Sequence, residues 1–500
     1  MVLGAVDSLP VAPAGGPILL TAKVETGRPG LDIAPSFIGF STEYGGGSVE
    51  HYFYRRLYET IGSVPKPNPV VVQLFKNLTV LQGPPVLRVG GNSTDQMWWT
   101  RHPFASTPPQ GASIAITPAW LKATRAFVDT THTPLILGIN LAANQPQLGA
   151  AWAKAAWAEL GGHRIQAFEI GNEPNYFAKH GLRSAPFGFA QYLQQFKAYV
   201  YALRAWHSKV PLAGPATSAA SPHYLSLNSW AQYLPEFLRA MSPHLTMVTY
   251  HRYPLNRCHV DPGSARYPTV GELLSPAASA QLGQEAEQYV RDAKPYHVPV
   301  RVSEINSIAC GGAPGLSNSA ASALWATDTL FYLAQAGISG VNFQVGGYRS
   351  TYAPFRVVQV GVERENVEVY PLYYGLLLFA QAASHQARIL PTIGHGLAEV
   401  KLWATRDARG TVHVVVINQS ASRAGHAAIQ IPGAGNPATL VYLHSQGLTA
   451  TTGMTLAGQT YATQSGKPQG PYTAYRVQDR AGYYEFAVPA AGAALLTVPG

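Results

Sequence analysis

Eight short apolar segments, separated by stretches long enough for a helix, constrain the fold of this chain more than any other feature. They lie at residues 37–40, 85–89, 135–141, 165–170, 210–214, 247–251, 298–304 and 341–345. Apolar runs of this length, bounded by turn residues, are typical of buried strands. Eight such strands alternating with helices predict a (β/α)₈ barrel in the α/β class. The clearest intervening helix is predicted at 189–206, with Tyr192, Phe196 and Tyr199 on the face that packs against the barrel.

The pattern changes after residue 384. Short segments rich in Val, Leu and Tyr follow one another, separated by turn residues and without a helix between them, at 399–404, 412–417, 427–431, 440–443, 483–488 and 494–498. This pattern predicts an antiparallel β-sandwich. A lone strand near residues 16–26 is expected to join it. The predicted organisation is therefore 1–33 as a strand of the sandwich, 34–384 as the catalytic barrel and 385–500 as the sandwich domain.

Composition limits the classes of partner. The chain has 500 residues and a formal net charge of +9, from 35 Lys and Arg against 26 Asp and Glu. Such an excess attracts polyanions, but the basic residues are scattered, so we expect an acidic glycan as a possible partner and no nucleic acid. No apolar run has the length of a membrane span, and no metal or nucleotide motif occurs. We therefore expect no membrane span, no cofactor and no metal, and a monomer.

The sequence Gly171-Asn172-Glu173-Pro174 follows the apolar run 165–170 directly. Pro174 cannot donate to a strand ladder and restricts the conformation of Glu173, which indicates a sharp turn at the end of a strand. In a (β/α)₈ barrel the strand ends carry the active site, so Glu173 is a candidate general acid. Taken alone, the segment also fits a turn with a solvated glutamate.

A second carboxylate, Glu304, ends the seventh predicted strand. Two carboxylates facing each other at a barrel mouth suit glycoside hydrolysis, in which one protonates the leaving oxygen while the other attacks the anomeric carbon. A separation of roughly 5–5.5 Å would predict retention of configuration. We expect Asn172 to hydrogen-bond the sugar 2-OH, and Glu173 to stay protonated near neutrality because of burial and the charge of Glu304. For Glu304 alone, a surface ion pair is the alternative.

Several segments resemble glycoside hydrolase family 79, the β-glucuronidases and heparanases. The resemblance runs from about residue 37 to residue 376 and is carried by the segments 87–92, 168–175 and 248–253, by Ser303-Glu304 with the following Gly311-Gly312-Ala313-Pro314, and by Gly347-Tyr348. The Gly-Asn-Glu-Pro motif is specific only to the wider clan of retaining barrel glycosidases. The segment from Glu304 to Pro314 is the family-level signal.

The resemblance implies roles for the residues that match the family motifs. Glu173 matches the acid/base and Glu304 the nucleophile. The residues implied in substrate binding are Glu43, Asn92, Asn172, His251, Tyr253, Gly311, Gly347 and Tyr348. Among these, a backbone N–H at Gly311 and the phenol of Tyr348 would hold the uronate carboxylate, a task that neutral donors can perform in a partly dry pocket.

Two cysteines, Cys258 and Cys310, follow the sixth and seventh predicted strands, which are neighbours in a barrel. We expect a disulfide between them that joins two active-site loops. Such a bond favours an exported protein, secreted or periplasmic, although residues 1–14 show no signal peptide.

The leading hypothesis is a retaining exo-β-glucuronidase that acts on glucuronic-acid-containing glycosides or glycans. No long excised linker of the heparanase kind is evident, which favours exo action. Three alternatives remain: an endo-acting hydrolase of heparan sulfate or hyaluronan, a neutral-sugar glycosidase of the same clan, and a non-catalytic glycan-binding protein.

Overall fold

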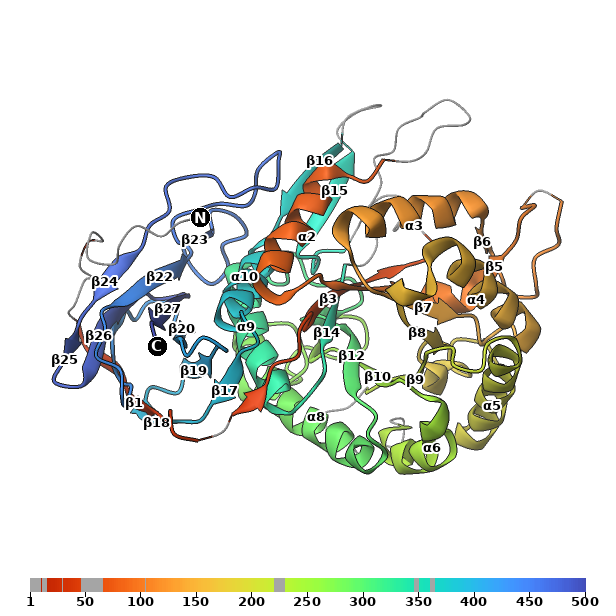
Figure 1. Ribbon diagram of the computed structural model, residues 1–500, viewed down its shortest axis with the longest axis horizontal. Helices are drawn as coiled ribbons and strands as arrows, with labels where there is room; N and C mark the ends of the chain where they lie inside the picture. Colours follow the sequence, from red (N-terminus) through yellow and green to blue (C-terminus); the bar gives the residue numbers. More distant parts are fainter. Residues whose placement is uncertain are drawn as a thin grey trace.

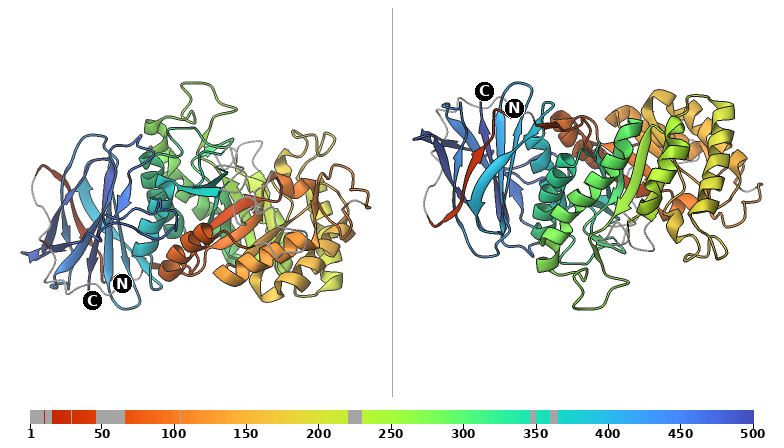
Figure 2. Two further views of the ribbon diagram at one scale, coloured as in Figure 1. Left: turned by 90° about the horizontal axis from the view of Figure 1, so that it is seen from above. Right: turned by 90° about the horizontal axis from the view of Figure 1, so that it is seen from below.

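The protein consists of a helix-covered barrel and a β-sandwich that lie side by side (Figures 1 and 2). The computed structural model describes residues 10, 16–28, 30–45, 66–103, 105–219, 230–345, 350–359 and 365–500. Within these ranges, no helix has the length and apolarity that crossing a membrane requires.

Eight parallel strands close the barrel in the order β10-β12-β14-β3-β4-β7-β8-β9. They are β3 (Ile38–Glu43), β4 (Val86–Gly90), β7 (Leu135–Ile139), β8 (Ile165–Ile170), β9 (Leu212–Ser218), β10 (Met247–Arg252), β12 (Val300–Ile305) and β14 (Val341–Gln344). Each overlaps one predicted apolar run, so the predicted barrel is confirmed. The strands read as continuous apolar runs because helices cover their outer face and side chains fill the interior.

Helices surround this barrel (Figure 1). The longer ones are α2 (Pro69–Gln82), α3 (Pro118–Thr131), α4 (Pro146–Leu160), α5 (Phe189–Trp206), α6 (Leu234–Met241), α8 (Ala280–Ala293), α9 (Ala320–Gln335) and α10 (Pro371–Ala382). Asn68 and Thr117 begin α2 and α3 because their side-chain oxygens accept hydrogen bonds from the first-turn N–H groups. Helix α5 has the predicted bounds, and Tyr192, Phe196 and Tyr199 are buried as expected.

Short elements lie in the loops between strands and helices. They are the strand pairs β5 (Met97–Trp99) with β6 (Ile114–Ile116), β11 (Leu255–Asn256) with β13 (Ile308–Ala309) and β15 (Phe355–Gln359) with β16 (Glu365–Val369), the helix α7 (Val270–Leu273), and the 3₁₀ turns η2 (Asn92–Gln96), η3 (Gly162–Arg164), η4 (Pro174–Tyr176), η5 (Trp230–Tyr233), η6 (Ser242–His244), η7 (Pro276–Ala278) and η8 (Lys294–Tyr296). Two of these, η2 and η4, follow barrel strands directly and carry candidate site residues.

The sandwich consists of two sheets. One has the order β18-β1-β21-β26-β25, and the other the order β2-β17-β19-β20-β27-β22-β23, with β24 paired to β22. Their strands are β1 (Ile18–Val24), β2 (Leu31–Asp32), β17 (Arg388–Leu390), β18 (Thr392–Gly396), β19 (Val400–Arg406), β20 (Val412–Asn418), β21 (Gly425–Gln430), β22 (Ala438–His444), β23 (Thr455–Leu456), β24 (Tyr475–Val477), β25 (Asp479–Arg480), β26 (Tyr483–Val488) and β27 (Gly492–Val498). The predicted sandwich with an added N-terminal strand is confirmed.

Two features of the sandwich differ from the expectation. Strand β1 pairs in parallel with β21, whereas its other neighbour, β18, is antiparallel. Strands β17, β18 and the short β23–β25 lie outside the predicted segments. Strand β18 reads Thr-Ile-Gly-His-Gly, and its two glycines remove the apolar alternation by which a strand is recognised in sequence.

Strand β20 joins the two bodies because both of its faces are buried. Val414 and Val416 belong to the sandwich core, while Val415 and Ile417 belong to the core that continues into the barrel. Trp403 on β19 adds a polar contact across the junction, since its Nε1 donates to Oδ1 of Asp328 on α9 at 2.8 Å. The sandwich is therefore packed on the barrel through a continuous apolar interface with a specific hydrogen bond.

Candidate active site

Glu173 lies in the turn that follows β8. Its backbone is left-handed, with φ of 49° and ψ of 52°, a region that non-glycine residues adopt at a cost of about 1–2 kcal/mol. The N–H of Glu173 donates to the carbonyl of Ala216 at 2.9 Å, and its own carbonyl accepts from Tyr176. This strained, doubly anchored turn aims the carboxylate across the barrel mouth.

Glu304 lies near the end of β12, on the opposite side of the same barrel mouth. Its Oε1 accepts a hydrogen bond from the hydroxyl of Tyr253 at 2.9 Å, and its Oε2 lies 2.7 Å from Nη1 of Arg88. The side chain is only 12% exposed. Two donors therefore hold both oxygens of a largely buried carboxylate in one orientation, as a nucleophile requires.

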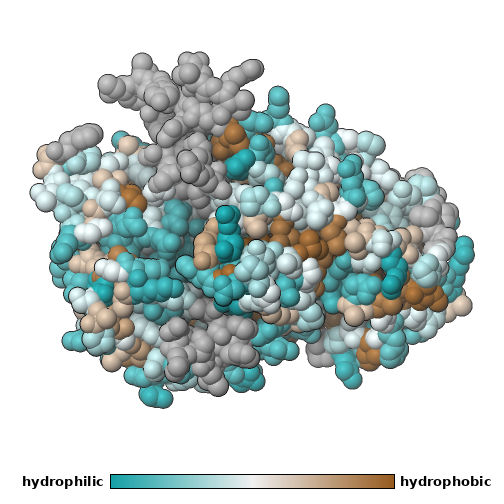
Figure 3. Space-filling view, turned by 180° about the vertical axis from the view of Figure 1, so that it is seen from behind, coloured by the Kyte–Doolittle hydropathy of each residue, from teal (hydrophilic) through white to brown (hydrophobic). Residues whose placement is uncertain are grey.

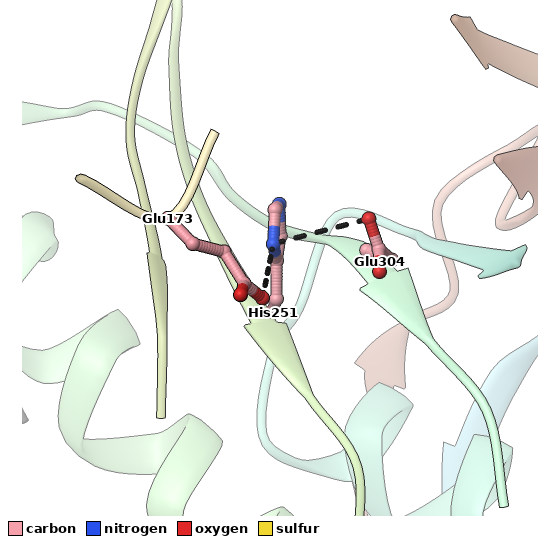
Figure 4. Close-up of side chains that lie close together, drawn as sticks. All are labelled: Glu173, His251 and Glu304. Atoms are coloured by element: carbon pink, nitrogen blue, oxygen red, sulfur yellow. Dashed lines mark hydrogen bonds and ion pairs between the residues drawn. The ribbon is translucent and has the colours of Figure 1, made fainter. Parts of the chain in front are cut away.

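His251 stands between the two carboxylates (Figure 4). Strand pairing places it level with Glu304 on the adjacent strand. Its Nδ1 lies 3.1 Å from Oε1 of Glu173 and 4.0 Å from Oε2 of Glu304. Glu173, His251 and Glu304 each offer one atom, and these three atoms all lie within 4.8 Å of one another.

The expectation that burial and Glu304 raise the pKa of Glu173 needs correction. Burial does act in that direction, but the hydrogen bond and charge of His251 outweigh it and lower the pKa of Glu173 below its ordinary value. The protonation of Glu173, which would supply the proton for a leaving group, therefore depends on its contact with His251. Sequence reasoning overlooked this because the pairing depends on contact between strands.

Arg88 is the largest omission from the sequence analysis. It is fully buried on β4, and its guanidinium bonds to Glu304, to Glu169 on β8 and to Oδ1 of Asn172. These carboxylates raise the pKa of Arg88 even though burial opposes the charge. The available signal was a lone charged residue within each of two apolar runs, Val86–Gly90 and Ile165–Ile170, because buried charges are normally paired.

Glu43 ends β3 and is held by the turn after β4. Its Oε2 accepts from the backbone N–H and the hydroxyl of Ser93 at 2.8 and 2.5 Å, and its Oε1 from the N–H of Asn92 at 3.2 Å and from Nε2 of Gln344 at 3.3 Å. Burial and then the charge of Glu304 raise the pKa of Glu43. Its position beside the carboxylate pair is suitable for contact with sugar hydroxyls.

Asn172 is anchored from three sides. Besides accepting from Arg88, it donates its amide to Oδ1 of Asn92 at 3.2 Å and its backbone N–H to Oδ2 of Asp95 at 3.0 Å. The other oxygen of Asp95 accepts from the backbone N–H groups of Leu141 and Ala142. Burial raises the pKa of Asp95 to about 7. Asp95, which the sequence analysis did not single out, thus ties the end of β7 to the Asn172–Glu173 turn.

The loops after β10 and β12 are joined twice. Cys258 and Cys310 form a disulfide with their Cα atoms 6.2 Å apart, and β11 pairs with β13. Gly311 follows with φ of 83°, and its carbonyl accepts from the backbone and hydroxyl of Thr351. Gly347 and Tyr348 lie outside the described residues.

The structure therefore brings Glu43, Asn92, Asn172, Glu173, His251, Tyr253 and Glu304 together at the strand ends, with Gly311 on a braced neighbouring loop. The atoms of Glu173, His251 and Glu304 also have the chemistry of a divalent cation site. However, both carboxylate oxygens of Glu304 already have partners, Arg88 and Tyr253, and a metal cation bound there would lie close to the positive guanidinium of Arg88. The donor set fits an acid and a nucleophile better than a metal ligand set.

Comparisons with known proteins show similarity in sequence and in fold. Residues 398–495 match the family model described as the glycosyl hydrolase family 79 C-terminal beta domain. A β-glucuronidase of Aspergillus niger is 25% identical over 374 residues, which cover 70% of this chain and 65% of the relative. The match thus spans slightly less than two thirds of that protein's length.

Two solved structures are similar over nearly their whole length. A 4-O-α-L-rhamnosyl-β-D-glucuronidase from Fusarium oxysporum has a TM-score of 0.72 and 16% identity, with 97% of this chain and 99% of that chain covered. A GH51 arabinofuranosidase from Xanthomonas axonopodis has a TM-score of 0.70 and 15% identity, covering 96% and 100%. At such identities the likeness establishes the fold.

The fold is a closed (β/α)₈ barrel joined to a β-sandwich, which is the fold of the glucuronidase and arabinofuranosidase structures above, and two carboxylates face each other at the strand ends of this barrel. The matched C-terminal domain and the relatives confirm, more narrowly, the resemblance to glycoside hydrolase family 79.

Proposed function

We propose that this protein is a retaining exo-β-glucuronidase that removes terminal β-D-glucuronic acid from glycosides or glycans. The observation that carries the mechanism is that Glu173 and Glu304 bring carboxylate oxygens within 4.8 Å of each other across the mouth. Retaining glycosidases have carboxyl groups about 5–5.5 Å apart, whereas inverting enzymes need about 6.5–9.5 Å to admit a water. The short separation favours a double displacement.

In the first step a Glu304 oxygen attacks the anomeric carbon while Glu173 gives a proton to the glycosidic oxygen. The bond to the aglycone breaks, the aglycone leaves protonated, and a glycosyl ester forms on Glu304. Tyr253 and Arg88 hold the attacking carboxylate at 2.9 and 2.7 Å. We expect Asn172 and Glu43 to contact the sugar hydroxyls, and the contact of Asn172 with the 2-OH to strengthen in the transition state.

In the second step Glu173, now ionised, takes a proton from water, whose oxygen attacks the anomeric carbon and displaces Glu304. The hydrogen bond from His251 to Glu173 suits this half of the cycle, because it stabilises the anionic form that acts as base. Glu173 thus alternates between acid and base, as microscopic reversibility requires.

Preference for a uronic acid rests on the family resemblance and on the relatives named β-glucuronidase. The proposed carboxylate-binding groups are the backbone N–H of Gly311 and the segment with Gly347 and Tyr348. The GH51 arabinofuranosidase with the same fold keeps a neutral-sugar glycosidase as the competing assignment. An endo-acting enzyme on acidic polysaccharide is the second competitor.

Three substrates separate these assignments: chromogenic β-glucuronide, β-glucoside and α-L-arabinofuranoside. We expect strong preference for the glucuronide, and a loss of about 10²–10⁴-fold in Glu173→Gln. Comparable rates on the neutral sugars would overturn the uronate assignment, and release of only internal fragments from a glucuronic-acid polymer would favour endo action. Full activity in Glu304→Gln would remove the mechanism.

Retention and the nucleophile are tested separately. We expect the first-formed sugar to keep the β configuration by proton NMR, and a 2-deoxy-2-fluoro glucuronosyl fluoride to label Glu304, as read by peptide mass. Activity that fell with a chelator and returned with a divalent metal would instead support the cation site.

The remaining proposals concern location and state. We propose an exported monomer, because the Cys258–Cys310 disulfide suits an oxidising compartment. On the visible face in Figure 3 the apolar residues form separate patches among hydrophilic ones. This agrees with a protein that needs no permanent partner on that face.

A further inference from the structure

Below the two facing carboxylates lies a third, Glu169, which the mechanism above does not use. Glu169 is fully buried on β8, and its Oε2 lies 2.7 Å from Nε and 2.6 Å from Nη2 of Arg88. The same guanidinium reaches Glu304 through Nη1 at 2.7 Å. One buried cation therefore serves two buried carboxylates on different strands.

The hydrogen bonds of Arg88 leave its guanidinium no freedom to turn. Arg88 donates four hydrogen bonds, one each to Glu169, Glu304, Asn172 and Ser41, and its Nη2 also makes an ion-pair contact with Oε2 of Glu169. Strand pairing supports this arrangement, because Ser41 lies opposite Arg88 in the ladder between β3 and β4. Oε2 of Glu169 contacts both Nε and Nη2 of Arg88, and this helps to orient Nη1 toward Glu304.

Resting on the proposed double displacement, we propose that Glu169 is a positioning residue that shares Arg88 with Glu304 and so keeps the Glu304 carboxylate more basic and more nucleophilic. A carboxylate with an arginine to itself is strongly stabilised as an anion and is a weaker base. When the arginine is shared, the second carboxylate offsets much of that stabilisation. Glu304 therefore keeps the orientation that Arg88 gives it, and it loses less nucleophilicity than it would if Arg88 had no second carboxylate partner.

Other groups also act on the two carboxylates, and the test must hold them constant. Those facing Glu304 are Arg88 from β4, Glu43 from the end of β3, Glu173 from the turn after β8, and His251 and Tyr253 from β10 and the residue after it. Those facing Glu169 are Arg88, His251, Tyr44 and Tyr192. None of them changes in a variant confined to Glu169.

The decisive variant is Glu169→Gln, which keeps the shape and an acceptor for Arg88 but removes the charge. Arg88 then stabilises the Glu304 anion alone. The acid limb of kcat/KM, which reports the nucleophile of the free enzyme, moves about one pH unit lower. Because kcat/KM includes attack by Glu304 while the second step releases it, we expect kcat/KM to fall about tenfold and kcat to fall less. Glu169→Asp, which restores the charge, should recover part of both effects.

Glu285→Gln is the matched control. Glu285 is another buried glutamate paired with an arginine, Arg252, through contacts of 2.7 and 3.1 Å in the same barrel. It contacts neither Glu304 nor Arg88. We expect Glu285→Gln to lower the melting temperature and leave the acid limb in place. If Glu169→Gln behaves in the same way, Glu169 has a structural role only and the proposal is wrong.

A second readout needs no substrate, so failure of the proposed function would not hide the result. The protein labelled with carboxyl-¹³C glutamate is titrated by NMR, and the Glu304 signal is assigned by its loss in Glu304→Gln. A lower midpoint for Glu304 in Glu169→Gln supports the proposal even if no glycoside is hydrolysed. An unchanged or higher midpoint overturns it.

Discussion

Nδ1 of His251 lies 3.1 Å from Oε1 of Glu173, and this contact opposes the effect that burial has on the acid/base carboxyl. Because His251 stabilises the anion of Glu173, it affects the pH at which this candidate general acid loses and regains its proton. The contact therefore sets the pH range in which Glu173 carries the proton, and the range can be measured.

In His251→Phe the hydrogen bond and the charge are absent while the burial of Glu173 remains. Since His251 lowers the pKa of Glu173, its removal should raise that pKa. The basic limb of the kcat/KM profile, which reports loss of the acid proton, should then move to higher pH. His251→Asn, with a neutral donor near Nδ1, should move it less. A basic limb that stays in place in both variants would mean that His251 does not control Glu173.

Removing the Tyr253 hydroxyl should weaken catalysis without unfolding the protein. That hydroxyl donates to Oε1 of Glu304 at 2.9 Å, and a hydrogen bond to a charged group contributes about 1.5–3 kcal/mol. If the contact holds in the transition state, Tyr253→Phe should lower kcat/KM about 10–100-fold. Tyr250→Phe is the control, because Tyr250 stacks on Tyr289 with ring centres 4.0 Å apart. Equal losses in both variants would argue against a specific role.

The disulfide between Cys258 and Cys310 should stabilise the protein measurably. It closes a loop with a sequence separation of 52 residues, for which loop entropy gives roughly 3–4 kcal/mol. The double variant Cys258→Ser with Cys310→Ser should lose free energy of unfolding on this scale in urea titrations. Thiol titration of the unreduced, denatured wild type should find no free thiol, and finding two would show that the bond does not form.

The buried His413 on β20 should make stability fall in mild acid. Burial lowers its pKa to about 4, while the unfolded chain protonates near about 6.5. Between these values the unfolded state binds a proton that the folded state does not, so stability decreases as pH falls from about 6.5 to about 4, by about 3 kcal/mol in all. His413→Gln should reduce this decrease, measured as unfolding free energy at several pH values.

The control for His413 is His395→Gln, on the exposed strand β18. Its pH dependence of stability should match that of the wild type. If His413→Gln also follows the wild-type curve, the folded protein takes up the proton at His413 without penalty.

Much of the fold was accessible from sequence because apolar runs and turn residues act locally. The eight barrel strands and the helix Phe189–Trp206 follow from spacing alone. The parallel pairing of β1 with β21, however, joins residues some four hundred positions apart and leaves no local pattern. Strand β18, with its two glycines, was missed for a related reason: its place in the sheet comes from backbone pairing and not from side-chain alternation.

The site divides in the same way. That Glu173 follows a strand in a Gly-Asn-Glu-Pro turn, and that Glu304 ends another strand, could be predicted from the amino-acid sequence, because strand, turn and proline are properties of neighbouring residues. The position of Arg88 between Glu169 and Glu304, which are 81 and 216 residues away from it, became visible only in the folded chain, as did the contact of His251 with Glu173. These contacts escape sequence patterns because charge interactions depend on distance in space. In a closed barrel, strand order and register set that distance, and neither is written in any one segment of the chain.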